Sequence, residues 1–224
     1  PHVTLSGALD GDSIIAGSIQ GAEGSALENL VLTAGTGVST LLNMNDVSMR
    51  VTKVQFLGNN TLTPTGTGIN VTGENPATAI IEQCLFSSLA VGINVNGAIP
   101  LIRRNVFENL AQSGIILRAF SKAQGGALGQ AGDPTVGCNT FALTIGGPAV
   151  VNERNEIIKM ELNDWGTVDV DEIAGRITGE TDFEPYLATG GGLLAGSLYC
   201  TVWKEENQEH ILNASIKAGT FGPV

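Results

Sequence analysis

Apolar, small and aromatic residues recur along this chain in a fixed order and spacing. In the clearest copy, Ile102 is followed three positions later by Asn105 and five positions later by Phe107. The second and third members are two positions apart, as expected for residues on one face of a short β-strand. The same spacing returns at Val51, Val54 and Phe56, at Ile81, Cys84 and Phe86, at Val136, Asn139 and Phe141, and at Met160, Asn163 and Trp165, with a weaker aliphatic copy at Leu27, Leu30 and Leu32.

A second short strand is predicted after most copies and is usually introduced by glycine. These strands are Gly68–Val71, Gly92–Val95, Gly114–Leu117 and Pro148–Val151. One coil of two strands cannot bury its apolar face unless further coils stack on it. The repeat therefore predicts an all-β solenoid, a right-handed parallel β-helix, over residues 1–187. An antiparallel sandwich would explain the alternation and the glycine content, but not the recurring triplet.

Stacked coils bring equivalent positions of the motif about 4.8 Å apart, the spacing of hydrogen-bonded strands. The aromatic positions should then form one stack, which adds roughly 0.5–1.5 kcal/mol per ring pair beyond burial. The asparagines should form a hydrogen-bonded ladder at a turn, with Cys84 as a small apolar substitute. The predicted stack is Phe56, Phe86, Phe107, Phe141 and Trp165, and the predicted ladder is Asn105, Asn139 and Asn163.

The spacing between successive aromatic positions is uneven, which predicts loops on some coils. Two of the steps are 21 and 24 residues, as expected for bare coils, whereas Phe56 to Phe86 and Phe107 to Phe141 are 30 and 34 residues. Insertions in repeat proteins often collect on the binding face. We assign the excess residues to side loops near Asn60–Thr78 and near Ala119–Pro134.

The pattern changes after Leu187, so residues 188–224 are predicted to form a linker and a C-terminal hairpin. The linker is Gly190–Gly192, and the strands of the hairpin are Ser197–Lys204 and His210–Lys217. Because an isolated hairpin is marginally stable, it should cap its own helix or pack on a neighbouring subunit. Tyr199, Trp203 and Ile211 are the side chains that would suit such an interface.

The opposite end begins as a strand at Pro1–Leu5 without an obvious capping helix. An uncovered strand edge is a template for adding further strands. We therefore expect either that upstream coils have been removed or that another subunit docks there. The second case predicts a homo-oligomer that assembles end to end or by β-strand addition.

The composition and charge of the chain limit the kinds of partner that the protein is expected to bind. The formal net charge is -11, and the Lys and Arg residues show no strong cluster along the sequence, which argues against nucleic acid. No apolar run is long enough for a transmembrane helix.

Three widely spaced cysteines, Cys84, Cys138 and Cys200, form neither a zinc pattern nor a disulfide framework. One disulfide plus one free thiol is an alternative to three buried thiols, and the pairing stays open.

The triplets, together with Asn163-Asp164-Trp165-Gly166, resemble the parallel β-helix repeats of the pectate-lyase-like superfamily. Asn105-Val106-Phe107 followed by Ser113-Gly114-Ile115 is similar to its typical repeat, and Thr181–Leu187 is similar to an extended segment of secreted and cell-surface members. The resemblance covers roughly Val3 to Leu187. It implies the fold and a secreted or cell-surface location, but not one function, because this architecture hosts lyases, hydrolases, adhesins and structural proteins.

A lyase-like site would need calcium-binding carboxylates and an arginine base on adjacent coils. The candidate bases are Arg103, Arg104 and Arg118, and the candidate acids are Glu82, Glu108 and Asp133, which do not fall in register. Glu82 and Arg103 are 21 residues apart, so they should lie side by side, most simply as a surface ion pair.

Other chemistry has weaker support in the sequence. His2 and His210 have no catalytic-triad context. The acidic stretch of Asp164, Asp169, Asp171 and Glu172 could bind calcium, but it fits better as a loop and the start of a short helix over Val170–Ile177.

The sequence therefore predicts a non-catalytic extracellular or cell-surface β-helix scaffold, either self-assembling or in contact with carbohydrate. It predicts no catalytic residue, no metal site and no required cofactor, although calcium stays open. The alternative is a calcium-dependent polysaccharide lyase or a related carbohydrate-active enzyme that uses Arg103, Arg104 or Arg118.

Overall fold

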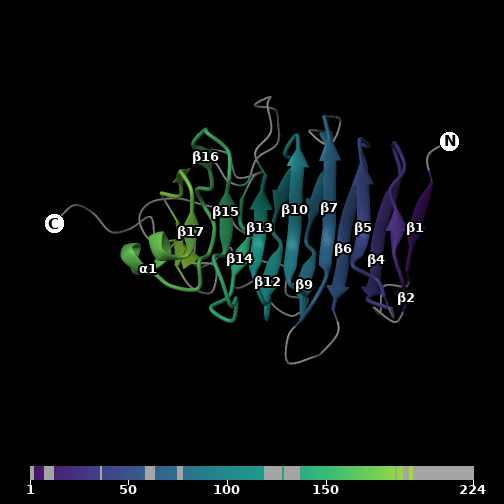
Figure 1. The fold of residues 1–224 in the computed structure, drawn as a ribbon, viewed down its shortest axis with the longest axis horizontal. Helices are drawn as coiled ribbons and strands as arrows, with labels where there is room; N and C mark the ends of the chain where they lie inside the picture. Colours follow the sequence, from purple (N-terminus) through teal and green to yellow (C-terminus); the bar gives the residue numbers. More distant parts are fainter. Residues whose placement is uncertain are drawn as a thin grey trace.

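The computed structural model describes residues 3–7, 13–35, 37–58, 64–74, 78–118, 128, 137–184, 186–188 and 192–193. Over these residues the chain winds into a parallel β-helix whose coils stack from the N-terminal end towards α1 (Figure 1). Two long parallel sheets form its walls, and the apolar core lies between them. The fold class expected from the repeat is confirmed.

Sheet A is a nine-stranded sheet with the main order β1-β4-β6-β9-β12-β14, to which β2, β8 and β11 also pair. In it the apolar residues of the motif lie in register, as Leu27 pairs with Val51 and Val51 pairs with Ile81. The strands are β1 (Thr4–Ser6), β2 (Ile14–Ala16), β4 (Ala26–Thr33), β6 (Arg50–Leu57), β8 (Ile80–Glu82), β9 (Leu85–Ser87), β11 (Leu101–Arg103), β12 (Val106–Glu108) and β14 (Thr140–Phe141).

Sheet B contains the second strand of each coil and has seven strands in the order β17-β15-β13-β10-β7-β5-β3. Its strands are β3 (Ile19–Gln20), β5 (Thr40–Asn45), β7 (Thr67–Gly73), β10 (Val91–Gly97), β13 (Ser113–Leu117), β15 (Val150–Asn152) and β17 (Ile177–Thr178). Strand β7 lies within the span assigned to the first side loop, so much of that span belongs to the coil itself. Most of the second predicted loop lies outside the described residues.

Each coil bends within sheet A at a residue with left-handed backbone. These residues stand immediately before the small or asparagine position of the motif, and the φ of Lys53 and Arg104 is 56° at both. A left-handed residue turns the chain sharply. The bend divides the motif into two short strands at β8 and β9 and at β11 and β12, whereas β4 and β6 continue through it. The bend residues are Asn29, Lys53, Gln83, Arg104, Cys138 and Leu162.

The predicted aromatic stack is present in the core. Phe86 and Phe107 have ring centroids 4.9 Å apart and are nearly parallel, and the stack ends on Trp165, 4.9 Å from Phe141. All five rings are completely buried. Their spacing matches that of adjacent strands, so the stack follows directly from the stacking of equivalent positions.

The predicted asparagine ladder is also present. The Asn139 Oδ1 atom accepts hydrogen bonds from the backbone N–H and the side-chain amide of Asn105, each at 3.1 Å. Asn163 Oδ1 likewise accepts hydrogen bonds from the backbone N–H of Asn139 at 2.8 Å and from its side-chain amide at 3.0 Å. At the start of the ladder, Cys84 donates its backbone N–H to Asn105 Oδ1 at 2.9 Å. The ladder satisfies buried polar groups at every bend that it crosses.

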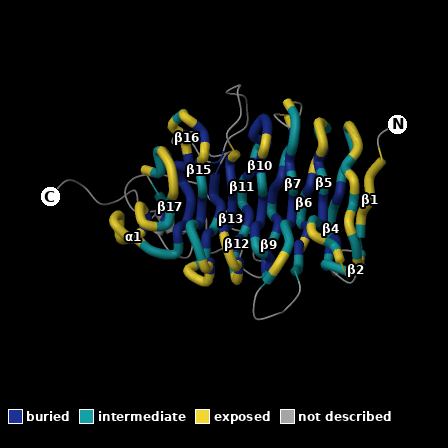
Figure 2. The backbone as a smooth tube through the Cα atoms, viewed as in Figure 1, coloured by how far each residue is buried: buried dark blue, intermediate teal, exposed yellow. Residues whose placement is uncertain are grey.

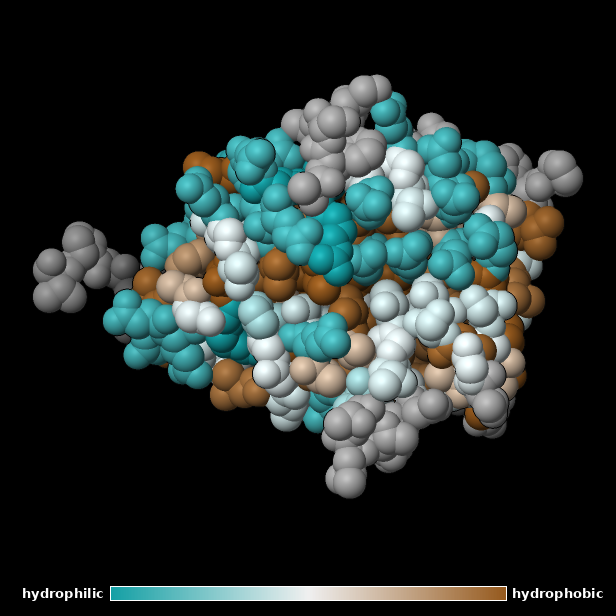
Figure 3. All heavy atoms as spheres, in the orientation of Figure 1, coloured by the Kyte–Doolittle hydropathy of each residue, from teal (hydrophilic) through white to brown (hydrophobic). Residues whose placement is uncertain are grey.

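The first coil leaves apolar side chains exposed at the N-terminal end. Val3, Leu5 and Ile14 are exposed, and brown hydrophobic atoms gather at this end in Figure 3. Leu5 pairs in register with buried Leu27, so it opens the same inward-facing column. The exposed edge strands are yellow and teal in Figure 2.

The far end carries the only helix of the described residues, α1 (Val170–Gly175). The Asp169 side chain caps it by accepting hydrogen bonds from the backbone N–H groups of Asp171 and Glu172. The sequence predicted a helix as far as Ile177, but α1 ends at Gly175 because Ile177 begins β17. No helix of the described part could cross a membrane.

Beyond the helix, β16 (Ile158–Lys159) pairs with β18 (Thr181–Asp182), and β19 (Leu187–Ala188) pairs antiparallel with β20 (Gly192–Leu193). Strand β20 therefore begins inside the segment predicted as a linker. The predicted hairpin of Ser197–Lys204 and His210–Lys217 lies outside the described residues.

Candidate functional site

Half of the described cationic side chains gather on sheet A. Eight Lys and Arg residues are described, and four of them lie in sheet A on the two coils that flank the coil of Glu82. Thr52 pairs in register with Glu82, and Glu82 with Arg103, which brings the cations of the two flanking coils close to the Glu82 carboxylate. We call Arg50, Lys53, Arg103 and Arg104, with Glu82 between them, the cationic patch.

Glu82 holds two of the arginines in place. Its Oε2 atom accepts a hydrogen bond from Arg103 Nε at 2.8 Å and lies 2.6 Å from Arg103 Nη2, while Oε1 bonds the Arg50 guanidinium. The Glu82 side chain is 5% exposed, that of Arg103 is 17% exposed and that of Arg50 is 51% exposed. The Glu82–Arg103 neighbourhood predicted from the spacing is confirmed, but its carboxylate is buried and has two partners.

Burial by itself would raise the pKa of Glu82. The hydrogen bonds and charges of Arg50 and Arg103 outweigh that effect, so the pKa lies below its ordinary value. Glu82 therefore stays a carboxylate near neutral pH and holds no proton to donate as a general acid.

Arg104 differs from Arg103 in its partners. It occupies a bend position, and its backbone N–H donates to the carbonyl of Gly137 at 2.9 Å. Within the described part of the chain, its half-buried side chain has no hydrogen-bond or ion-pair partner, and its Nε atom is buried. Lys53 stands at the equivalent bend two coils earlier. The patch therefore contains a guanidinium without a hydrogen-bond or ion-pair partner among the described residues.

The other four described cations lie elsewhere and are engaged. Arg118 extends from the end of β13 in sheet B, where it bonds Asn94 Oδ1 at 3.1 Å and Glu153 at 2.6 Å. Arg154 and Lys159 pair with nearby glutamates, and Arg176 donates to backbone carbonyls beneath α1. Of the three candidate bases, the structure brings Arg103 and Arg104 together and places Arg118 on the other sheet.

The remaining site residues are dispersed or lie outside the described part. Glu108 stands half-buried on β12, away from the bend. Asp133, Tyr199, Trp203 and Ile211 are not among the described residues. The aromatic and asparagine ladders are buried structural elements, as the repeat predicted.

The positions of the acidic side chains show whether enough of them lie together to hold calcium. Among the described residues, no group of three or more His, Cys, Asp or Glu side chains could hold a metal ion. In the acidic stretch, Asp169 caps α1, and Asp164 Oδ1 accepts the backbone N–H of Gly166 at 2.9 Å.

The cysteines fall into two states. Cys84 is a free thiol, and burial raises its pKa to about 12. Cys138 is disulfide-bonded, with a partner outside the described residues. The alternative of one disulfide and one free thiol fits these two states.

The sequence missed the cationic patch because its members are spread over 55 positions, from 50 to 104. Only Arg103 and Arg104 are adjacent in sequence. The signal was present in the repeat: with the triplets aligned, Lys53 and Arg104 fall at the same motif position, and Glu82 and Arg103 share the position before it.

Comparison with known proteins gave no match to any family model, to any curated protein or to any solved structure.

Proposed function

We propose that the protein is a non-catalytic, extracellular β-helix scaffold of the pectate-lyase-like type that binds acidic polysaccharides through the cationic patch. One observation carries the proposal: Arg104, in a chain of net charge -11, has no anionic partner among the described residues and stands beside an arginine already fixed by Glu82. An unpaired guanidinium in an acidic protein favours an external anion. Carboxylate and sulfate groups match the planar donor geometry of arginine.

The arrangement of the patch supports a polymeric ligand. Lys53 and Arg104 occupy equivalent positions two coils apart, which places them roughly 10 Å apart along the axis at about 4.8 Å per coil. An elongated anionic chain that follows the axis could therefore meet Lys53 and Arg104 in turn. Because Glu82 restrains Arg50 and Arg103, less side-chain entropy is lost when they contact the ligand.

Two features support the other parts of the proposal. The Glu82 carboxylate is engaged by two arginines, so the patch offers binding groups without a poised acid or base. A disulfide at Cys138 is expected in an oxidising compartment, which supports a secreted or cell-surface location.

The proposal is tested by affinity electrophoresis in gels that contain polygalacturonate or, for comparison, neutral dextran. Wild-type protein should be retarded by polygalacturonate only, and added sodium chloride should weaken the effect. The double variant Lys53→Ala/Arg104→Ala should lose at least tenfold in affinity. The matched control is Arg118→Ala, which removes a cation from sheet B and should bind like wild type.

Equal retardation by dextran, or an equal loss in Arg118→Ala, would contradict the proposal. The lyase alternative gives a different readout, since cleavage by elimination produces unsaturated sugars that absorb in the ultraviolet. A calcium-dependent rise in absorbance that disappears in Arg103→Ala or Arg104→Ala would establish the enzyme and overturn the non-catalytic proposal.

A further inference from the structure

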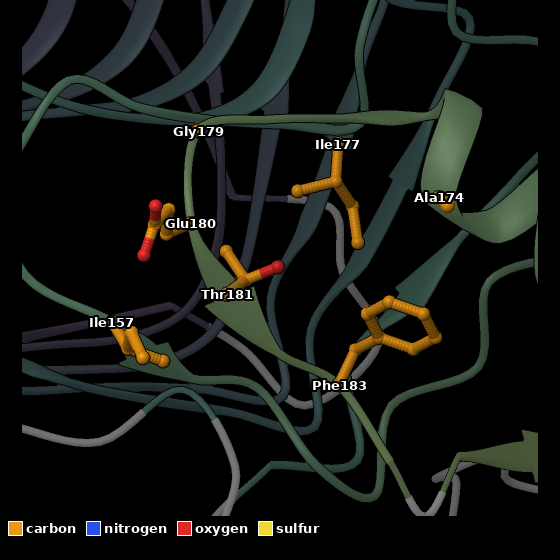
Figure 4. A pocket seen from close by; sticks show the side chains of 7 residues that line it. All are labelled: Ile157, Ala174, Ile177, Gly179, Glu180, Thr181 and Phe183. Carbon is orange, nitrogen blue, oxygen red and sulfur yellow. The ribbon is translucent and has the colours of Figure 1, made fainter.

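An apolar pocket of about 310 Å³ opens at the C-terminal end of the solenoid. Ile157, Ile177 and Phe183 supply its apolar walls together with Ala174 of α1, and Thr181 and Glu180 add polar atoms at its edge (Figure 4). Ile157 is 63% exposed, so much of its apolar surface is uncovered at the pocket.

The pocket is the unfilled end of the core. Ile177 pairs in register with buried Val150, so it continues an inward column of sheet B. Phe183 packs edge-on against Trp165, the last ring of the stack, at 6.3 Å. Both side chains lie where the next coil would cover them, and α1 covers only part of this end.

We propose that Trp203 of the same chain fills this pocket, so that the segment after Leu193 caps the solenoid. The segment starts at this end because Leu187 of β19 donates its backbone N–H to Asn163 on the last coil, and β20 runs back beside β19. Leu193 is followed by 31 residues (224 − 193 = 31). Trp203 is ten residues beyond Leu193, a reach of at most about 36 Å when extended.

The chemistry of the pocket suits this side chain. Tryptophan is the largest apolar residue and buries roughly 150–250 Å². The Thr181 hydroxyl at the edge could accept the indole N–H, which a buried tryptophan usually needs. Lys204 follows Trp203 directly in the sequence, and the rim carries Glu180, so the charges are complementary.

The fluorescence of Trp203 tests the proposal because the chain contains only two tryptophans. In Trp165→Phe, Trp203 is the single reporter. The replacement preserves the ring stack and removes no hydrogen bond, since Trp165 Nε1 has no partner in the described part. Emission should be blue-shifted, and acrylamide quenching should be several-fold weaker than for a peptide of residues 194–224.

A second experiment tests the proposal by blocking the pocket. Ala174 is exposed on α1, so Ala174→Arg should obstruct the pocket without disturbing the core. In the Trp165→Phe background it should move emission and quenching to the values of the peptide. The matched control is Leu143→Arg, which places the same charge at another exposed apolar position and should change neither.

Three results would overturn the proposal. One is emission identical to that of the peptide before the pocket is blocked. Another is protection that persists in Ala174→Arg, because Trp203 would then be buried elsewhere. The third is protection that disappears on dilution, which would assign the pocket to a second copy. If Trp165→Phe fails to fold, the difference spectrum between wild type and Trp203→Phe isolates the same signal.

Discussion

Gly92 and Phe107 fit together so closely that the glycine cannot carry a side chain. A Cβ atom at Gly92 would lie 2.7 Å from Cδ1 of Phe107 and 2.6 Å from the carbonyl oxygen of Gly114. Gly68 has the same relationship to Phe86, and Gly114 to Phe141 at 3.0 Å. The glycine that introduces the second strand of these coils therefore makes room for the aromatic stack.

Replacing Gly92 with alanine should destabilise the protein by about 1–3 kcal/mol, because the ring or the neighbouring backbone must move. Chemical denaturation monitored by circular dichroism measures the free energy of unfolding. Gly175→Ala is the matched control, since nothing lies within 4 Å of its Cβ position at the end of α1. That variant should be neutral or slightly more stable. A similar loss in both variants would contradict the packing argument.

Asn139→Ala should cost more than about 2 kcal/mol of unfolding free energy. The Asn139 amide donates to Ile102 O at 3.1 Å and accepts from Asn105, so its loss leaves several buried groups without partners. Asn94→Ala is the control on the outer face of sheet B, where the amide bonds Asn70 at 2.8 Å in a less buried position. Its cost should be below about 1 kcal/mol, and thermal melts of both variants decide the order.

The Cys84 thiol should resist alkylation in the folded protein. Its pKa is raised to about 12 by burial, so at pH 8 almost no thiolate is present and reagents cannot reach it. Mass spectrometry after iodoacetamide treatment should find Cys84 unmodified in buffer and modified in denaturant. Rapid modification under native conditions would show that the core opens at this coil.

Glu82→Gln should destabilise the protein by about 1–3 kcal/mol at neutral pH, since it weakens the pairing with two arginines. The folded-state pKa of Glu82 is lower than in the unfolded chain, so the carboxylate stabilises the fold above its ordinary pKa of 4.5. This contribution is lost as the pH falls through the lowered value. Urea titrations between pH 7 and pH 3 should show the two proteins converging, whereas a constant difference would contradict the pairing.

The repeat predicted the core of the fold because both ladders consist of residues that must be buried in register. For Phe107 and Asn105, the residue type and the spacing of the motif are enough to predict a buried position in register with the neighbouring coils. The patch could not be recognised in the same way, because Arg50 and Arg104 look like ordinary surface cations until the coils are aligned. The buried state of Glu82 also depends on its two partners, and no single residue type signals it.

The first side loop was overestimated for a related reason. The long step from Phe56 to Phe86 predicts a loop near Asn60–Thr78, but the same span contains β7 (Thr67–Gly73), which confirms the strand predicted at Gly68–Val71. Spacing between rings alone overestimates the loop, because a strand of sheet B carries no aromatic residue of the motif.

The residue at the left-handed bend differs from coil to coil, so this column of the solenoid changes in character along the axis. The bend residue is not a member of the aromatic or the asparagine ladder, so it can be exchanged with little effect on either. Along the axis, the bend residues are half-buried polar side chains at Asn29, Lys53, Gln83 and Arg104, and they are buried at Cys138 and Leu162. The polar part of this column therefore ends towards α1, so the two orientations of an elongated molecule that lies along it are not equivalent.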